Sequence, residues 1–328
     1  MGVFDEKYWL PRNTTWESMP TQAADLIYPV YFMPVILIAR ILWESLVGVP
    51  IGWYLGYYGD ASLPGLVCHH MFGGFAANTR SKRVLECFTR FSYYSAAFIY
   101  GAIVMYNKSW LWDVRQAWIG YPYHTVDPEI WWYYMVEMSF YYMLLATAVF
   151  DVRRTDFWEL IFHHAVTIGL LSLSFTINFV RVGTLVLFSH DLADISLEGG
   201  KLFRYDSTKK TETTVVFVIF LISWIATRLG YFPFVVIRSA LFEAASLIQP
   251  DYDVFSLTQI PYAPRVIILM LCSLVVLHIF WTVIIVRIVY ITLTEGEVVD
   301  VRSDDEEGEL AEKERVKKLK KKMPRKDD

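Results

Sequence analysis

The sequence predicts an all-α, polytopic membrane protein. Hydrophobic residues make up 55% of its 328 residues and aromatic residues 17%, a composition that few soluble domains share. Several apolar runs reach the length of about 20 residues that a helix needs to cross a bilayer. Backbone polar groups in lipid must be satisfied within the segment, so these runs are expected to be helices.

Seven spans are expected, in chain order at about 27–50, 88–106, 131–150, 159–179, 182–203, 214–237 and 265–293. The first is the least regular, because it contains Arg40 and Glu44 and has prolines at its margins. Glu137 and Arg228 are further charges inside expected spans, and they fit a structural pair as well as part of a site. No internal repeat accompanies the spans.

Loop charges predict the orientation. Basic residues follow the first, third and fifth spans and the last one, namely Arg80, Lys82, Arg83, Arg153, Arg154, Arg204, Lys209, Lys210 and the tail KKLKKKMPRK. Such residues accumulate in cytoplasmic loops. Two glycosylation sequons, at Asn13 and Asn107, fall on the opposite side. We therefore expect a lumenal N-terminus, a cytosolic C-terminus and a first span that acts as an uncleaved signal.

The tail from about residue 300 is acidic and then basic, and we expect it to be solvated. Ser303 precedes Asp304, Asp305, Glu306 and Glu307, a pattern that acid-directed kinases prefer. Phosphorylation of Ser303 would add about −1.5 to −2 charges. A merely solubilising tail is the alternative.

Polar residues form a narrow face on two consecutive spans. On a helical wheel, the first face consists of His163, Thr167, Ser174, Asn178 and, if the helix persists, Arg181, with His164 beside it. The face of the next span consists of His190, Asp191, Asp194, Glu198 and Lys201. A very short turn joins the two spans, so the faces are expected to meet around a polar cavity.

His163 and Asp194 are expected at a similar depth in the membrane. At 1.5 Å per residue, each lies roughly 10 to 13 Å inside the cytosolic boundary. Ionisable groups there cost about 2.5 kcal/mol or more each and mark functional sites. A histidine near a carboxylate can act as a general base or a nucleophile. Purely structural polarity and a metal site are the alternatives, since His and Asp are also metal ligands.

A metal site has weaker support than acid–base chemistry. Membrane di-iron enzymes cluster their histidines, whereas His69, His70, His124 and His278 lie far from the polar faces in sequence. The three cysteines, Cys68, Cys87 and Cys272, have spacings that suggest neither a zinc site nor a disulfide framework. We therefore expect no metal and no other cofactor.

The pattern resembles the longevity-assurance motif of ceramide synthases, which are TLC-domain membrane proteins. It reads HHxxT from His163, SxxxNxxRxGT from Ser174 and HDxxDxxLExxK from His190. The segments WWYYMVEMSFYYMLL, TRLGYFPFVVIRS and LHIFWTVIIVRI are also similar to segments of that family. The resemblance covers about 84–303. The loop at about 51–87 is too short for the homeobox-like insert of many animal members, which is not universal.

The resemblance implies transfer of a fatty acyl group from acyl-CoA, as co-substrate, to the amine of a sphingoid base in the endoplasmic reticulum membrane. It implies catalytic roles for His163, His164, Asp191 and Asp194, with His190 beside them. His163 would attack the thioester, which gives an acyl-imidazole, or activate it for direct transfer, and Asp191 or Asp194 would orient His163 or take the amine's proton. Candidate substrate-binding residues are Ser174, Asn178, Arg181, Glu198 and Lys201.

The same resemblance suggests the organisation of the chain and its partners. The expected parts are a lumenal segment at 1–26, a first span and cytosolic loop at 27–83, a catalytic TLC domain at 84–295 and a cytosolic tail at 296–328. Chain-length choice would depend on the segment at about 239–263. Expected partners are acyl-CoA, a sphingoid base, membrane lipids and a second subunit in a homo- or heterodimer, but not nucleic acid.

Two other functions are open to this sequence. One is a non-catalytic TLC-domain protein that assists translocation or carries lipid, although such proteins typically lack the full set of histidines and aspartates. The other is a transporter with a proton-coupled histidine–aspartate pair. A transporter would be expected to show broken helices or internal similarity, and neither is evident here.

Overall fold

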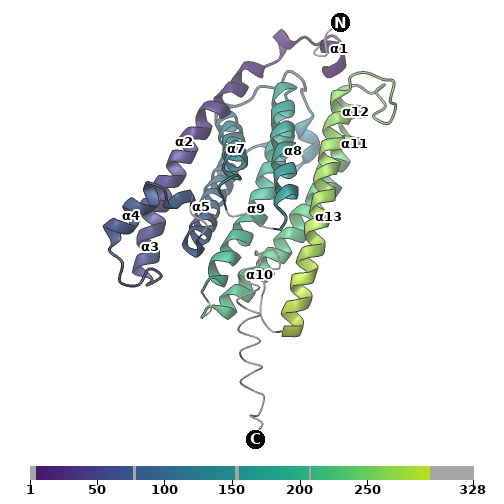
Figure 1. Cartoon of the computed structure of the whole chain (residues 1–328). Helices are drawn as coiled ribbons and strands as arrows, with labels where there is room; N and C mark the ends of the chain where they lie inside the picture. Colours follow the sequence, from purple (N-terminus) through teal and green to yellow (C-terminus); the bar gives the residue numbers. More distant parts are fainter. Residues whose placement is uncertain (1–4, 77–78, 152–154, 207, 296–328) are drawn as a thin grey trace, which may run out of the picture.

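The computed structural model describes residues 5–76, 79–151, 155–206 and 208–295, and within these ranges every regular element is helical. Figure 1 shows a bundle of long helices, with the N-terminal segment at its upper end. The all-α prediction is therefore confirmed. Ser303, the basic tail, Arg153 and Arg154 lie outside the described residues.

The long helices carry the bundle. In chain order they are α2 (Ile27–Trp43), continued by η3 (Glu44–Gly48) and α3 (Val49–Tyr54), then α5 (Arg80–Met105), α7 (Pro128–Thr147), α8 (Phe157–Thr176), α9 (Val180–Arg204), α10 (Lys210–Trp224), continued by η6 (Ile225–Ile237), and α13 (Ala263–Glu295). The short elements are α1 (Glu6–Trp9), η1 (Trp16–Ser18), η2 (Ala23–Leu26), α4 (Leu63–Met71), η4 (Gly74–Ala76), α6 (Ser109–Trp112), η5 (Val114–Ala117), α11 (Arg238–Phe242) and α12 (Ala244–Ile248).

Four helical stretches among the described residues are long and apolar enough to cross a membrane. They are Ala23–Tyr54, Phe157–Thr176, Lys210–Ile248 and Ala263–Thr294. The other three expected spans fall on α5, α7 and α9, which carry many charged, Tyr and Trp residues and therefore have lower hydropathy. The count of seven spans stays a prediction.

Helix α9 lies among several neighbours. It packs most extensively against α5 and α10 and also contacts η6, α7 and α8, while α2 packs along α7. The core between these helices is rich in aromatic rings, since Tyr134, Phe140, Phe175 and Phe232 are almost fully buried. The polar residues of α9 are thereby surrounded by protein.

A short turn at Asn178 sets α8 against α9. Asn178 has a positive φ of 59°, a conformation that Asn tolerates better than most residues. Its side-chain amide donates to the carbonyl oxygens of Pro122 and His124 at 2.7 and 2.9 Å. The turn is thus attached to the loop before α7, and the two polar helices are held as antiparallel neighbours.

The sixth expected span changes its helical form halfway along. Segment η6 is π-helical over 13 residues and contains Pro233, which cannot donate a backbone hydrogen bond. π-helical turns are rare and often occur at functional sites. This segment presents Arg228 to α9, as described below.

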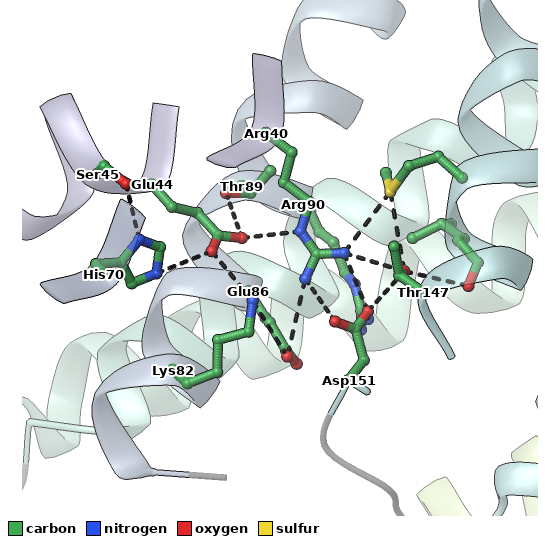
Figure 2. A network of polar contacts seen from close by, with 12 residues as sticks. Arg40, Glu44, Ser45, His70, Lys82, Glu86, Thr89, Arg90, Thr147 and Asp151 are labelled. Carbon is green, nitrogen blue, oxygen red and sulfur yellow. Dashed lines mark hydrogen bonds and ion pairs between the residues drawn. The ribbon is translucent and has the colours of Figure 1, made fainter. Parts of the chain in front are cut away.

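A buried ionic cluster joins α2 and η3 to the rest of the bundle (Figure 2). Its charged members are Arg40, Glu44, Lys82, Glu86, Arg90 and Asp151, with His70 beside them. Glu44 accepts from Arg40 at 2.9 Å and from Lys82 at 3.1 Å, and the His70 Nε2 atom lies 3.2 Å from it. Arg40 also donates to Asp151 at 2.7 Å. The charges that made the first span irregular are therefore paired inside the protein.

Candidate active site

Two cavities meet at His163. The upper cavity lies toward the end that carries the N-terminal segment and is lined mainly by apolar and aromatic residues, including Trp118, Tyr134, Leu170, Leu187, Ile267 and Leu274. The lower cavity is lined by many charged residues, including Arg90, Asp156, Asp194, Glu198, Lys201, Arg204 and Arg228. Of the residues that the structure describes, only His163 and Tyr141 line both. A molecule with an apolar chain and a charged head could therefore place its junction at His163.

The two adjacent histidines of α8 have different surroundings. The His163 ring meets the edge of Trp281 with ring centroids 5.4 Å apart, and the His164 ring meets Tyr141 at 6.0 Å. The Nδ1 atoms of both are buried without a hydrogen-bond partner in the described part of the chain. Aromatic walls thus hold His163 at the junction, and His164 lines only the lower cavity.

His190 belongs to the upper cavity. Its Nδ1 donates to the carbonyl oxygen of Val186 at 2.7 Å, and its Nε2 has no hydrogen-bond partner among the residues that the structure describes. Its ring lies 5.0 Å from Phe232 and 5.2 Å from His278. The hydrogen bond to Val186 therefore fixes the orientation of the His190 ring in the upper cavity.

Asp194 is paired with an arginine from η6. The Arg228 guanidinium donates to the Asp194 carboxylate at 2.9 Å and to the carbonyl oxygen of His190 at 3.0 Å. It also lies over the Trp224 ring at 5.5 Å. Asp194 and His163 both line the lower cavity, and their common depth in the membrane stays a prediction.

Asp191 lies away from both cavities. It is fully buried, and one carboxylate oxygen accepts from the Tyr133 hydroxyl at 3.2 Å. Its other oxygen has no hydrogen-bond partner among the residues that the structure describes. Asp191 faces α7, whereas Asp194, one turn later on α9, faces η6.

The residues expected to bind substrate fall into two groups. Ser174 is hydrogen-bonded to the Tyr134 hydroxyl, and Asn178 and Arg181 hold the loop before α7. Arg181 donates to the carbonyl oxygen of Ile119 at 3.1 Å and lies over the Trp110 ring at 4.7 Å. Of these three, only Ser174 lines a cavity, the upper one. Asn178 and Arg181 stabilise the turn in this structure.

Glu198 and Lys201 form the second group. The Lys201 ammonium donates to the Glu198 carboxylate at 2.5 Å, and both residues line the lower cavity with Arg90 and Arg204. Three basic side chains therefore line the lower cavity beside Glu198. Such a set of cations could attract a phosphorylated group.

Sequence reasoning missed several neighbours of the site. Arg228 pairs with Asp194 and not with Glu137, so the interpretation of Glu137 and Arg228 as a structural pair was wrong. His278 was set aside for its distance in sequence, yet its Nε2 lies 3.4 Å from Arg228. A signal was available, because His278 and Trp281 share one face of an otherwise apolar helix at i,i+3 spacing.

The donor set offers little to a metal ion. No group of three or more His, Cys, Asp or Glu side chains in the described ranges is arranged to hold one. What the arrangement offers is an imidazole at a cavity junction, a carboxylate held by arginine, and cationic side chains nearby. These are the parts of a nucleophilic or acid–base site.

Comparisons with known proteins agree with this picture. Residues 83–287, more than half of the chain, match the family model of the TLC domain. The chain is 56% identical to ceramide synthase hyl-1 of Caenorhabditis elegans over 307 residues, covering 91% of this chain and 83% of that protein. It is 37% identical to ceramide synthase hyl-2 of the same organism over 95% of this chain and 96% of that protein. Human ceramide synthase 5 is 29% identical over 93% and 86% of the two chains.

Proposed function

The chain belongs to the TLC-domain family as a ceramide synthase, and from that premise we propose that it transfers a fatty acyl group from acyl-CoA to the amine of a sphingoid base. The observation that carries this proposal is the position of His163, which lines an apolar and a charged cavity at once. We place the protein in the endoplasmic reticulum membrane with seven spans, a lumenal N-terminus and a cytosolic C-terminus. The basic residues in the loops predicted on one side and the two sequons predicted on the other side support this orientation.

The two cavities suit the two parts of acyl-CoA. An apolar cavity favours an acyl chain, because burying its methylene groups is worth about 0.8 kcal/mol each. Arg90, Lys201 and Arg204 around the lower cavity suit the phosphates of CoA. The thioester carbonyl would then lie beside His163. Residues Ala240, Ala244 and Ile248 line the upper cavity, which supports a role of the segment 239–263 in chain-length choice.

The first step is attack by the His163 imidazole on the thioester carbonyl. A bond forms from nitrogen to the acyl carbon and the carbon–sulfur bond breaks, so the thiolate leaves and takes the proton of the imidazole. Trp281 packs against the ring, and Asp194, which Arg228 holds in the lower cavity, is the carboxylate that would stabilise the positive charge that develops on the ring. Direct transfer without an acyl-histidine is the alternative.

In the second step the sphingoid amine attacks the acyl group. The sphingoid base arrives as an ammonium ion and first loses one proton to a base in the site. Its nitrogen then bonds to the acyl carbon, the bond to the imidazole breaks, and the imidazole takes the amine's second proton. The products are the amide, CoA as a thiol and the original neutral His163.

Replacing His163 with Ala tests the proposal. We expect N-acylation of sphinganine to fall by at least about 10³-fold, the order seen when a nucleophile is removed, with the protein still present in the membrane. His69→Ala is the matched control, because His69 is exposed and lines neither cavity. Full activity of His163→Ala would refute the assigned role. Wild-type protein with no acyl transfer at all would favour a non-catalytic TLC-domain protein.

Mass spectrometry separates the two chemical routes. Incubation of wild-type protein with acyl-CoA alone should add one acyl group to the peptide that contains His163. The group should disappear when sphinganine is added. An active enzyme that never carries the adduct would instead support direct transfer.

A further inference from the structure

The upper cavity extends from His163 to the end of the bundle that carries the N-terminal segment. Its lining residues on α13 run from Leu274 back to Ala263, a rise of about 16 Å at 1.5 Å per residue. The His163 ring contacts Trp281, which lies two turns beyond Leu274 on the same helix. Ala263 therefore marks the end of the cavity that is far from His163, and an acyl chain held at His163 would point its methyl end toward it.

The N-terminal segment supplies part of the wall at this far end. Trp9 and Pro11 both line the upper cavity. The backbone N–H of Tyr262, directly before Ala263, donates to the carbonyl oxygen of Tyr8 at 2.6 Å, which places Trp9 at the Ala263 end. Because the Trp9 and Pro11 side chains are largely apolar, this wall suits the methyl end of a hydrocarbon chain better than a polar group.

Several contacts hold the N-terminal segment in this position. Leu10 is only 1% exposed and belongs to the main hydrophobic core of the bundle. The rings of Tyr8 and Tyr262 are stacked with their centroids 5.5 Å apart, and Arg12 donates to Asp251 at 2.6 Å. The exposed ion pair contributes little by itself, so the burial of Leu10 and the stacked rings are the main attachments. The end wall is thus built from two parts of the chain that are distant in sequence, the N-terminal segment and the loop before α13.

We propose that Trp9 is a specificity-determining residue, which forms the end of the acyl cavity and limits the length of the acyl chain that the enzyme accepts. The inference rests on the proposed acyl transfer, and it adds the N-terminal segment to the segment 239–263 as a determinant of chain length. An acyl chain longer than the distance from His163 to Trp9 has to displace the indole or leave methylene groups unburied. Each methylene group left unburied lowers selectivity about fourfold, which corresponds to about 0.8 kcal/mol.

The chain-length selectivity of Trp9→Ala tests the proposal. Full-length wild type and variant, in membranes, receive sphinganine and saturated acyl-CoAs of increasing length. The kcat/KM for acyl-CoAs longer than the wild-type optimum, relative to that optimum, should rise about fourfold for each methylene group that enters the space of the indole. Trp9→Phe should shift selectivity less but in the same direction, and it carries the test if Trp9→Ala does not fold.

Trp16→Ala is the matched control for these variants. Trp16 lies on the same N-terminal segment and packs against the same core as Trp9, but it does not line the upper cavity. We expect Trp16→Ala to keep the chain-length selectivity of the wild type. Active Trp9→Ala and Trp9→Phe enzymes with wild-type selectivity, or an equal shift in Trp16→Ala, would overturn the proposal.

A photoreactive acyl-CoA tests the position of the acyl chain without any turnover. A long-chain acyl-CoA with a diazirine at its methyl end should label the peptide that contains Trp9 and Pro11, and an analogue with the diazirine next to the thioester should label the peptide that contains His163. Excess unmodified acyl-CoA should prevent both labels. A methyl-end probe that labels only other peptides would overturn the proposal. Labelling of the N-terminal segment in a protein that never transfers the acyl group would refute the proposed function and leave the position of the chain standing, so the two failures are distinguishable.

Discussion

At the scale of single residues, surroundings decide what the same side chain can do. Asp191 and Asp194 are one turn apart on α9, yet Asp194 meets an arginine and Asp191 meets a tyrosine hydroxyl. Asp194 thus accepts a hydrogen bond from a charged donor, and Asp191 accepts one from a neutral donor. The pattern of two aspartates in the sequence therefore holds two distinct chemical groups.

Gly183 shows how closely the wall of the upper cavity is packed. A Cβ atom at this position would lie 2.5 Å from the Tyr134 hydroxyl oxygen, and Tyr134 is fully buried and hydrogen-bonded to Ser174. Gly183→Ala should therefore destabilise the protein by about 1–3 kcal/mol, the usual cost of overpacking. Thermal unfolding in detergent would measure the change.

Gly200→Ala is the control for that substitution. Gly200 lies on the same helix, and a Cβ there would be at an ordinary 3.6 Å from Val216. We expect no loss of stability, and a gain of up to about 1 kcal/mol from helix propensity. Equal unfolding temperatures for the two variants would contradict the close contact with Tyr134.

His124 predicts a pH dependence of stability. Burial, assisted by the nearby Arg181 charge, lowers the pKa of His124 from 6.5 to about 4. The unfolded chain binds a proton near pH 6.5, but the folded protein does not until about pH 4, so the stabilisation present above pH 6.5 is lost as the pH falls toward 4. His124→Gln should flatten the fall in unfolding temperature over this range. His69→Gln, at an exposed position, should leave the wild-type slope unchanged.

At the scale of elements, sequence patterns predicted where the helices lie in the chain better than which residues of different helices contact one another. Apolar runs and the short turn predicted α8 and α9 with their polar faces, because each signal is local in sequence. The pairing of Arg228 with Asp194 depends on a π-helical segment bringing residues 34 positions apart together. No local pattern predicts such a contact, so neighbours of the site on η6 and α13 were missed.

The buried ionic cluster should stabilise the packing of α2 and η3 on the bundle, and a substitution of Glu44 tests this. Glu44 is fully buried and contacts Arg40, Lys82, Thr89 and His70. Glu44→Gln would remove one counter-charge from a cluster in which Arg40, Lys82 and Arg90 face Glu44, Glu86 and Asp151, and such an unbalanced buried charge typically costs about 3–5 kcal/mol. We expect a large fall in unfolding temperature or in the yield of folded protein.

An ion pair on the surface provides the control for Glu44→Gln. Glu212 lies 3.4 Å from Lys209, and both side chains are about half exposed. Glu212→Gln should change stability by no more than about 1 kcal/mol. If Glu44→Gln lowered stability no more than Glu212→Gln does, the cluster would not stabilise the packing of α2 and η3 on the bundle.

At the scale of the whole molecule, the structure groups the chain's connections at two ends. The N-terminal segment meets the loop before α13 through a 2.6 Å ion pair between Arg12 and Asp251 and through stacked Tyr8 and Tyr262 rings 5.5 Å apart. At the other end, Arg80 donates to the carbonyl oxygen of Tyr205. Segments that the charge pattern assigns to one side of the membrane therefore lie at one end of the bundle.

Glycosylation tests which end of the bundle faces the lumen. Asn13 and Asn107 are both exposed at the end that carries the N-terminal segment, but Asn107 follows directly after α5 and so lies closer to the membrane. We expect a glycosidase to increase the gel mobility of the wild-type protein and Asn13→Gln to remove most of that shift. In sealed microsomes, added protease should also remove the C-terminal tail without detergent. A tail that is cleaved only after permeabilisation would reverse the assignment, since both ends of the bundle cannot face the cytosol.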